Sequence, residues 1–92
     1  MMVAQDDITT FMGTLDPAEY EQRRRIRTFR NAASYKVTQT GSTTARTLCW
    51  MATEEATAWI YAPADLAALE SVSRFLRRLL ILADHAEEIG AP

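Results

Sequence analysis

Apolar residues near the amino end of the chain recur at the spacing of a helix. Four of them between Ile8 and Leu15 follow the pattern i, i+3, i+4, i+7. Asp6 and Asp7 precede the pattern as capping residues, and Gly13 falls near its end. The pattern predicts a short helix within the N-terminal segment, residues 1–15.

A stronger helix signal begins at Asp16. The Asp16 side chain can accept hydrogen bonds from the amides of a first helical turn, and Pro17 suits a position whose N–H has no partner. Glu19 can reach back to the Asp16 amide and complete a capping box. We therefore predict a helix over residues 16–33. Its expected buried stripe consists of Ala18, Ile26, Phe29 and Ala33.

The middle of the chain, residues 34–61, is rich in threonine and aromatic residues, a composition typical of strands. Gly41 and Ser42 interrupt this segment as a turn. In the stretch after the turn, Leu48 and Trp50 would lie on one face of a strand. The segment predicts three strands, which cover residues 35–40, 43–52 and 57–61.

The connection between the last two predicted strands leaves a second interpretation open. Residues 53–56 contain no glycine, asparagine or proline, the residues that tight hairpin turns favour. Thr53 could instead be the N-cap of a short helix over residues 54–60. The strand is the preferred interpretation, and the helix is the alternative.

The longest helical pattern covers residues 63–89. Pro63 suits the first helical position, Asp65 the first turn and Gly90 the C-terminal cap. Ile81 is an apolar residue on the otherwise polar face. The main apolar stripe comprises Leu66, Leu69, Val72, Leu76, Leu79 and Ala83, and it is widened by Ala68, Phe75, Leu82, Ala86 and Ile89.

The length of this last helix bears on how the protein completes its surface. About 26 residues span roughly 39 Å, whereas a compact domain of this size has a diameter of roughly 32 Å. Either the N-terminal helix folds back over the long helix, or a second copy or a foreign partner covers it. The elements together predict a single α+β domain over residues 1–92. In it, a three-stranded antiparallel sheet is covered by two longer helices in the order α-β-β-β-α, after a short N-terminal helix.

Composition excludes several classes of function. The chain has 92 residues with one cysteine and one histidine, so it can form neither an intrachain disulfide nor a four-ligand Cys/His zinc site. Cys49 and His85 are the only pair a cysteine enzyme could use, and His85 with Glu88 supplies too few metal ligands. We expect no enzyme activity, no catalytic residues, no metal and no cofactor. Without a signal peptide or an apolar run that could span a bilayer, the expected location is cytoplasmic.

Charge is the remaining chemical signal. The net charge is −2, from 12 acidic and 10 basic residues, so no overall field attracts polyanions. Two arginine clusters stand out within that total, one over residues 23–30 and one over residues 74–78. Acidic residues four positions earlier can pair with them on an ordinary solvent-exposed face, as for Glu70 and Arg74. The alternative is a partner-binding surface, whose candidate residues are Arg23, Arg24, Arg27, Arg30, Arg74, Arg78 and Ile81.

The predicted order of elements is similar to that of the double-stranded-RNA-binding domain. That family has a lysine cluster at the start of its last helix, where this chain has the acidic stretch Pro63-Ala64-Asp65-Leu66, so RNA binding is not carried over. Over residues 16–89 the chain also resembles small phage-encoded anti-CRISPR inhibitors, through the hairpin-like stretch Leu48 to Tyr61 that runs into the last helix. That resemblance implies steric blocking of a defence complex without catalysis.

These observations lead to one expectation for function and two alternatives. We expect a small non-enzymatic protein-binding or regulatory module, such as a phage or mobile-element inhibitor that occludes a surface of a host complex. The first alternative is a nucleic-acid-binding regulator that uses the arginine-rich face of residues 23–30. The second is a homo-oligomer, such as a dimer, built on the helix over residues 63–89.

Overall fold

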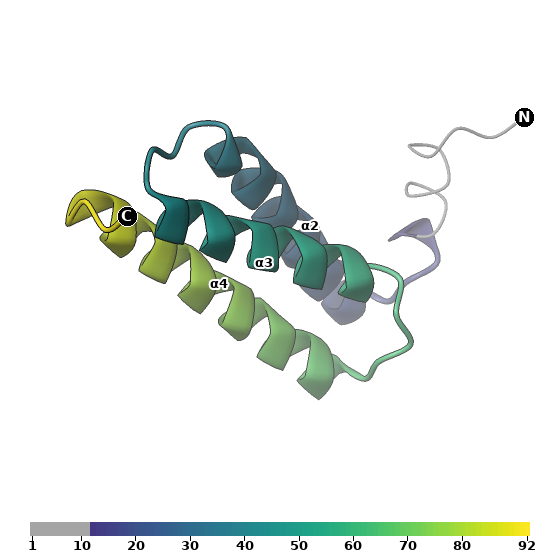
Figure 1. The fold of residues 1–92 in the computed structure, drawn as a ribbon. Coiled ribbons are helices and arrows are strands. Elements are labelled where there is room, and N and C mark those ends of the chain that lie inside the picture. The colour runs from purple at the N-terminus through teal and green to yellow at the C-terminus, as the bar shows by residue number, and fades with distance from the viewer. Residues whose placement is uncertain (1–11) are drawn as a thin grey trace, which may run out of the picture.

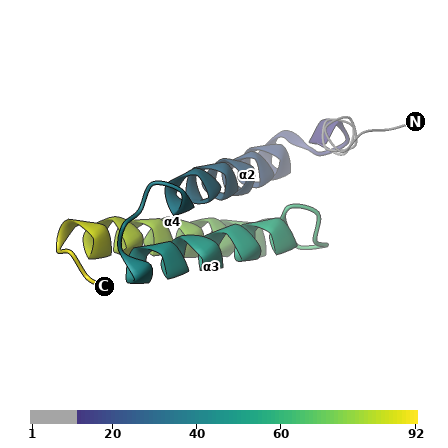
Figure 2. The same cartoon turned by 45° about the horizontal axis from the view of Figure 1, so that its top comes forward.

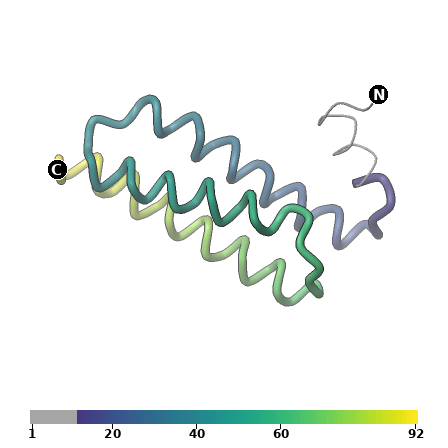
Figure 3. Tube along the Cα trace, turned by 45° about the vertical axis from the view of Figure 1, so that its right-hand side comes forward, coloured from purple at the N-terminus to yellow at the C-terminus, as the bar shows by residue number. Residues whose placement is uncertain are grey.

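The computed structural model describes residues 12–92, which fold into an up-down-up bundle of α-helices (Figure 1). The helices are α2 (Pro17–Val37), α3 (Thr43–Trp59) and α4 (Leu66–Glu88). Short connections join consecutive helices at alternating ends of the bundle, so each helix is antiparallel to the next (Figure 3). The short helix predicted within residues 1–15 lies almost wholly outside the described residues.

The predicted α+β fold is wrong, because residues 12–92 contain no strand. The last four residues of α2 and all of α3 occupy most of the segment assigned to the sheet. The buried residues of α3 are Ala45, Cys49, Ala52 and Ala56, at spacings of four, three and four. This stripe is helical but consists of small residues. The larger Trp50, which the strand prediction placed on one face with Leu48, is exposed, and so is the adjacent Met51.

Side-chain hydrogen bonds accommodate the threonines of α3. The hydroxyls of Thr47, Thr53 and Thr57 each donate to the backbone carbonyl four residues earlier, at 2.8–3.0 Å. Ser42 caps the helix by accepting from the amide of Ala45. The alternative helix over residues 54–60 was therefore correct in type. Its predicted start was wrong, because the N-cap of α3 is Ser42, eleven residues before Thr53, and the helix begins at Thr43.

The caps of the other two helices agree more closely with the sequence. Asp16 accepts from the amide of Glu19 at 2.8 Å, and Pro17 is the first residue of α2. Asp65 is the N-cap of α4, so this helix begins at Leu66 and Pro63 precedes it. At the other end Gly90 adopts a left-handed conformation with φ 72°. The amide of Ala91 donates to Ala86, which completes a Schellman motif.

The helix α2 lies across the neighbouring pair α3 and α4 (Figure 2). The core is formed by buried side chains of all three helices. Ile26, Ile60, Leu69 and Leu76 are its largest fully buried apolar side chains. On α3 the core positions are small, which lets the backbones of α2 and α4 approach this helix closely. The buried stripes predicted for the helices over residues 16–33 and 63–89 include most of the core residues of these helices, but they also include residues that are exposed. Among the expected core residues, Ala18, Leu66, Phe75, Leu82 and Ile89 are exposed.

Polar contacts fix the register of the helices at one end of the bundle. The carboxylate of Glu87 accepts from the amides of Gly41 and Ser42, just before α3 begins. The amide of Thr44 donates to the carbonyl of Pro92 at 2.8 Å, and Figure 1 shows the carboxyl end beside the first turn of α3. These contacts place the end of α4 against the start of α3.

Candidate functional site

Arg23 is a structural residue rather than a surface contact. Its side chain is 3% exposed, and its Nε donates to Glu19 at 3.0 Å. Its guanidinium also donates to the carbonyls of Trp59, Ile60 and Ala62 at 2.7–3.3 Å. Carbonyls at the end of a helix have no intrahelical partner, so Arg23 caps α3 from α2. The prediction that Arg23 contacts a partner does not agree with this burial.

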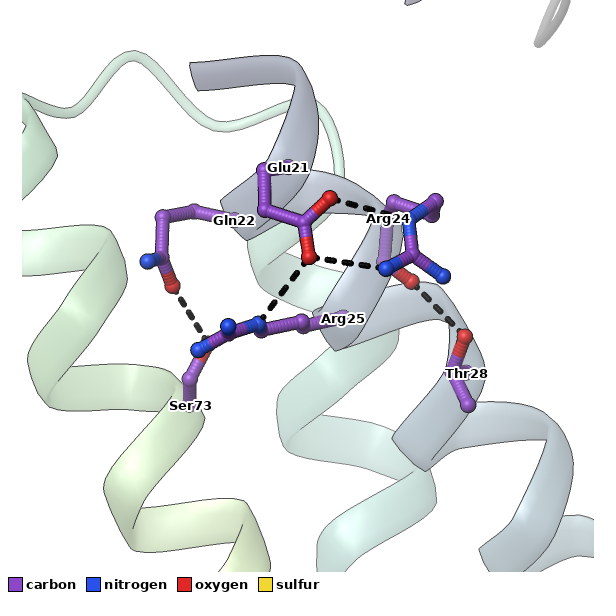
Figure 4. Close-up of polar contacts among 6 residues, drawn as sticks. All are labelled: Glu21, Gln22, Arg24, Arg25, Thr28 and Ser73. Atoms are coloured by element: carbon purple, nitrogen blue, oxygen red, sulfur yellow. Dashed lines mark hydrogen bonds and ion pairs between the residues drawn. The ribbon is translucent and has the colours of Figure 1, made fainter. Parts of the chain in front are cut away.

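Glu21 pairs with the next two arginines of the cluster on the surface of α2. It accepts from Arg24 at 2.7 Å and from Arg25 at 3.3 Å (Figure 4). The hydrogen bond from Arg24 lowers the pKa of Glu21, and the same bond raises the pKa of Arg24. The two pairs of residues four positions apart in this cluster, Glu19–Arg23 and Glu21–Arg25, thus both form.

A groove lies between α2 and α4, where the two arginine clusters come together. Its volume is about 230 Å³. The Gln22 side chain of α2 points toward Ser73 of α4 and accepts from its hydroxyl at 3.2 Å (Figure 4). This bond closes the gap between the helices beside the groove. We call this feature the arginine groove; its lining residues are Gln22, Arg25, Phe29, Glu70, Ser73, Arg74 and Arg77.

Arg74 and Arg77 are the two arginines of the groove that carry no ion pair with any described residue. The predicted pair between Glu70 and Arg74 does not form, although both side chains line the groove. Both guanidiniums are exposed, and Phe29 offers a half-buried aromatic ring beside them. Planar guanidiniums bind carboxylates and phosphates through paired hydrogen bonds. The groove can therefore bind an anionic group together with an adjacent apolar one.

The other predicted contact residues lie outside the arginine groove. Arg24 is exposed and paired with Glu21, and Arg30 donates to Asn31 at 3.3 Å. Arg27 lies in a shallow depression on another face, together with Tyr20. Arg78 and Ile81 are exposed on α4, at positions that do not line the groove.

The structure thus brings only some of the predicted partner-contact residues to the arginine groove. Arg74 is the one predicted residue that the arginine groove contains. Arg25 and Arg77 belong to it and were not selected from the sequence. A signal for Arg77 was present, since residues three apart share a helix face and Arg74 precedes it by three positions. The missing information was which face of α4 packs toward α2.

Among the described residues, Cys49 lies in the core and not in a cluster of possible metal ligands. Cys49 is buried in the bundle, and burial raises the pKa of its thiol, which keeps it protonated near neutral pH. His85 is exposed on α4. Within residues 12–92, no cluster of three or more His, Cys, Asp or Glu side chains is arranged to hold a metal ion.

Comparisons with known proteins and the search for membrane-spanning helices give no further assignment. No protein-family model, curated protein sequence or solved structure matches the chain. Among the helices of residues 12–92, none combines the length and apolar character required to cross a bilayer.

Proposed function

We propose that the protein is a non-enzymatic binding module that recognises an acidic segment of a partner protein through the arginine groove. The observation that carries this proposal is the pair Arg74 and Arg77. Both are exposed in the groove without a counterion among the described residues, beside the aromatic ring of Phe29. The partner would regulate, or be regulated by, occupation of this surface.

The chemistry of the groove favours a short acidic peptide with an apolar side chain. Carboxylates can pair with Arg74 and Arg77, and the apolar side chain can pack on Phe29. Glu70 lines the same groove and repels additional negative charge. A volume of about 230 Å³ holds only a few side chains. The groove therefore suits a motif with two or three anchoring residues.

Nucleic acid is a weaker fit to the same residues. A nucleic-acid site needs several cations aligned along a phosphate backbone. Glu21 pairs with both Arg24 and Arg25, and Arg23 is buried, so the cluster on α2 offers little free charge. The net charge of −2 also gives no long-range attraction for a polyanion.

An inhibitor role is not supported by the resemblance to anti-CRISPR proteins. That resemblance depended on a strand hairpin over Leu48 to Tyr61, and α3 occupies most of this stretch. The proposal of a binding module consequently depends on the arginine groove alone, and it names no host complex.

Fluorescence anisotropy with labelled peptides tests the proposal. The first probe is a peptide of glutamate, alanine and phenylalanine, and the second replaces every glutamate by glutamine. We expect the acidic peptide to bind and the neutral peptide to bind at least about tenfold more weakly, a difference of about 1.4 kcal/mol. A labelled single-stranded oligonucleotide of similar length is the third probe.

Adjacent arginines of α4 provide a matched pair of variants. Arg77→Glu reverses a charge inside the groove, and Arg78→Glu reverses one outside it. We expect Arg77→Glu to abolish binding of the acidic peptide and Arg78→Glu to leave it within about twofold. Equal effects of the two variants, or tighter binding of the oligonucleotide than of the peptide, would overturn the proposal.

A further inference from the structure

Three arginines from two helices line the arginine groove. Arg25 belongs to α2, whereas Arg74 and Arg77 belong to α4, where a spacing of three residues puts them on one side of the helix. Figure 4 shows the Arg25 side chain extending away from its own helix, with its guanidinium end nearer to Ser73 of α4. Ser73 also lines the groove and directly precedes Arg74. The Arg25 guanidinium therefore lies toward the side of the groove that the arginines of α4 form.

Most hydrogen-bond donors of these three arginines have no partner among the described residues. Glu21 accepts from Arg25 through Nε alone, at 3.3 Å, which leaves both terminal amino groups of that guanidinium. Arg74 and Arg77 form no ion pair with any described residue. A guanidinium holds its five N–H donors in a fixed fork that suits the oxygens of carboxylates and phosphates. The groove thus offers the terminal amino groups of three guanidiniums to one bound anion.

The charge of the groove exceeds what one carboxylate can balance. Its lining carries three arginines against the single acid Glu70, which gives a net charge of +2. Glu21 lies outside the groove and bonds more closely to Arg24 than to Arg25, at 2.7 Å against 3.3 Å. A carboxylate carries one negative charge, whereas a phosphorylated side chain carries about −1.5 to −2 at pH 7 and has three strong acceptor oxygens. A phosphorylated side chain therefore matches both the charge and the donors of the groove.

We infer that the arginine groove binds a phosphorylated side chain of the partner protein. This inference rests on the proposed function, because it narrows the acidic group that the groove recognises to a phosphoryl group. Carboxylates bring the same charge only on two side chains, and a groove of about 230 Å³ has room for few side chains. The oxygens of one phosphoryl group can accept from Arg25, Arg74 and Arg77 together. An apolar residue next to the phosphorylated one then packs on Phe29.

The surroundings of the groove favour a protein over a nucleic acid as the source of the phosphoryl group. A nucleic acid presents phosphates in series and needs several cations aligned along its backbone. Next to the groove on α2, Arg23 is buried and Arg24 is paired with Glu21. Glu70 adds a negative charge within the groove itself. The three arginines therefore suit one isolated phosphoryl group better than a row of phosphates.

Fluorescence anisotropy with three labelled peptides tests the inference. The peptides contain glutamate, alanine and phenylalanine and differ only at the position before phenylalanine, which is phosphoserine, glutamate or serine. We expect the phosphoserine peptide to bind at least about tenfold more tightly than the glutamate peptide, and the serine peptide to bind most weakly. Equal affinities of the phosphoserine and glutamate peptides would overturn this inference and leave the proposed function intact. A lack of binding by all three peptides up to about 1 mM would overturn both.

Arg24 and Arg25 provide a matched pair of variants. Both are exposed on α2 and both bond to Glu21, but only Arg25 lines the groove. We expect Arg25→Gln to weaken binding of the phosphoserine peptide at least about tenfold, and to remove most of its advantage over the glutamate peptide. Arg24→Gln should leave both affinities within about threefold, because solvent and salt screen an exposed charge outside the site. Both variants should retain the helical circular dichroism of the parent. Equal effects of the two variants would overturn the inference.

Two further probes distinguish a phosphopeptide from other sources of the same group. Inorganic phosphate lacks the apolar contact with Phe29, so we expect it to displace the phosphoserine peptide only at concentrations at least about tenfold above those of the unlabelled peptide. Equally effective displacement would identify a site for free phosphate instead. A labelled single-stranded oligonucleotide should bind more weakly than the phosphoserine peptide at about 0.15 M salt. Tighter binding of the oligonucleotide would overturn the inference in favour of a nucleic acid.

Discussion

Nη1 of Arg23 donates to the backbone carbonyl oxygen of Ile60 at 2.7 Å, and this bond joins α2 to the C-cap residue of α3. The same guanidinium reaches Ala62 in the connection to α4. One buried side chain therefore satisfies carbonyls of two successive segments. The charge is balanced by Glu19, one turn earlier on α2.

Loss of this side chain should destabilise the bundle strongly. Arg23→Ala leaves several carbonyls without a donor and leaves a cavity beside Ile60, so we expect a loss of about 2–4 kcal/mol in the free energy of unfolding. Urea denaturation followed by circular dichroism measures this loss. Arg23→Lys retains the charge but not the planar set of donors, and should fall between the parent and Arg23→Ala.

Arg24→Ala is the control for this prediction. Arg24 is adjacent in sequence and exposed, and among the residues described its side chain bonds to Glu21 alone. Exposed ion pairs contribute about 0–1 kcal/mol, so its loss should be small. Similar costs for Arg23→Ala and Arg24→Ala would show that Arg23 does not cap α3.

The pairing of Glu21 and Arg24 has a pH signature. Because Arg24 lowers the pKa of Glu21 in the folded chain, the pair favours folding above the unfolded-state pKa of this carboxyl group. That contribution is lost as the pH falls through the lowered pKa. We expect Arg24→Gln to raise the pKa of Glu21 toward its ordinary value, as measured by NMR titration of the side-chain carboxyl. An unchanged pKa would show that Arg25 or the helix terminus causes the shift.

The sequence predicted the start of α2 and the end of α4 because these ends have specific capping chemistry, whereas the end of α2 was predicted four residues too early, at residue 33 instead of Val37. Asp16 with Pro17, and Gly90 at the far end, act through local backbone geometry that does not depend on tertiary packing. The predicted start of α4 was less accurate because Pro63 and Asp65 both suit the start of a helix. The structure selects Asp65 as the N-cap.

α3 could not be predicted in the same way because its core-facing residues are small. Ala45, Cys49 and Ala52 give a weak hydrophobic signal, while Trp50 and Met51 give a strong one from the exposed face. Threonine adds β propensity, yet three threonines of α3 bond to their own helix backbone. Packing against α2 and α4 overrides these local preferences.

The arginine groove could not be predicted from the sequence either, because it depends on how the helices pack against one another. The sequence identified both arginine clusters but could not show that Arg23 points inward or that Arg74 and Arg77 face α2. Spacing along a helix places residues on a common face, but only the packing of the bundle decides whether that face is core, groove or open surface.

Cys49 provides a probe of the bundle interior. Its thiol is buried, and burial raises its pKa, so both the access of a reagent and the fraction of thiolate are low. We expect reaction with Ellman's reagent at neutral pH to be at least about a hundredfold slower in the folded chain than in urea, because access requires opening of the structure. Rapid modification of the folded chain, with retention of its helical circular dichroism, would contradict the burial of Cys49.

Replacement of alanines on α3 distinguishes the helix from the predicted strand most directly. In a strand over residues 57–61, Ala58 would lie on the same face as Ile60, which is buried. In α3, by contrast, Ala58 is exposed and it is Ala52 that faces the core. Ala52→Leu should therefore overpack the contact between helices and cost about 1–3 kcal/mol. Ala58→Leu should stay within about 0.5 kcal/mol of the parent in the same urea denaturation, because leucine is a strong helix former and the site is open. A larger loss for Ala58→Leu than for Ala52→Leu would contradict the orientation of α3 in the bundle.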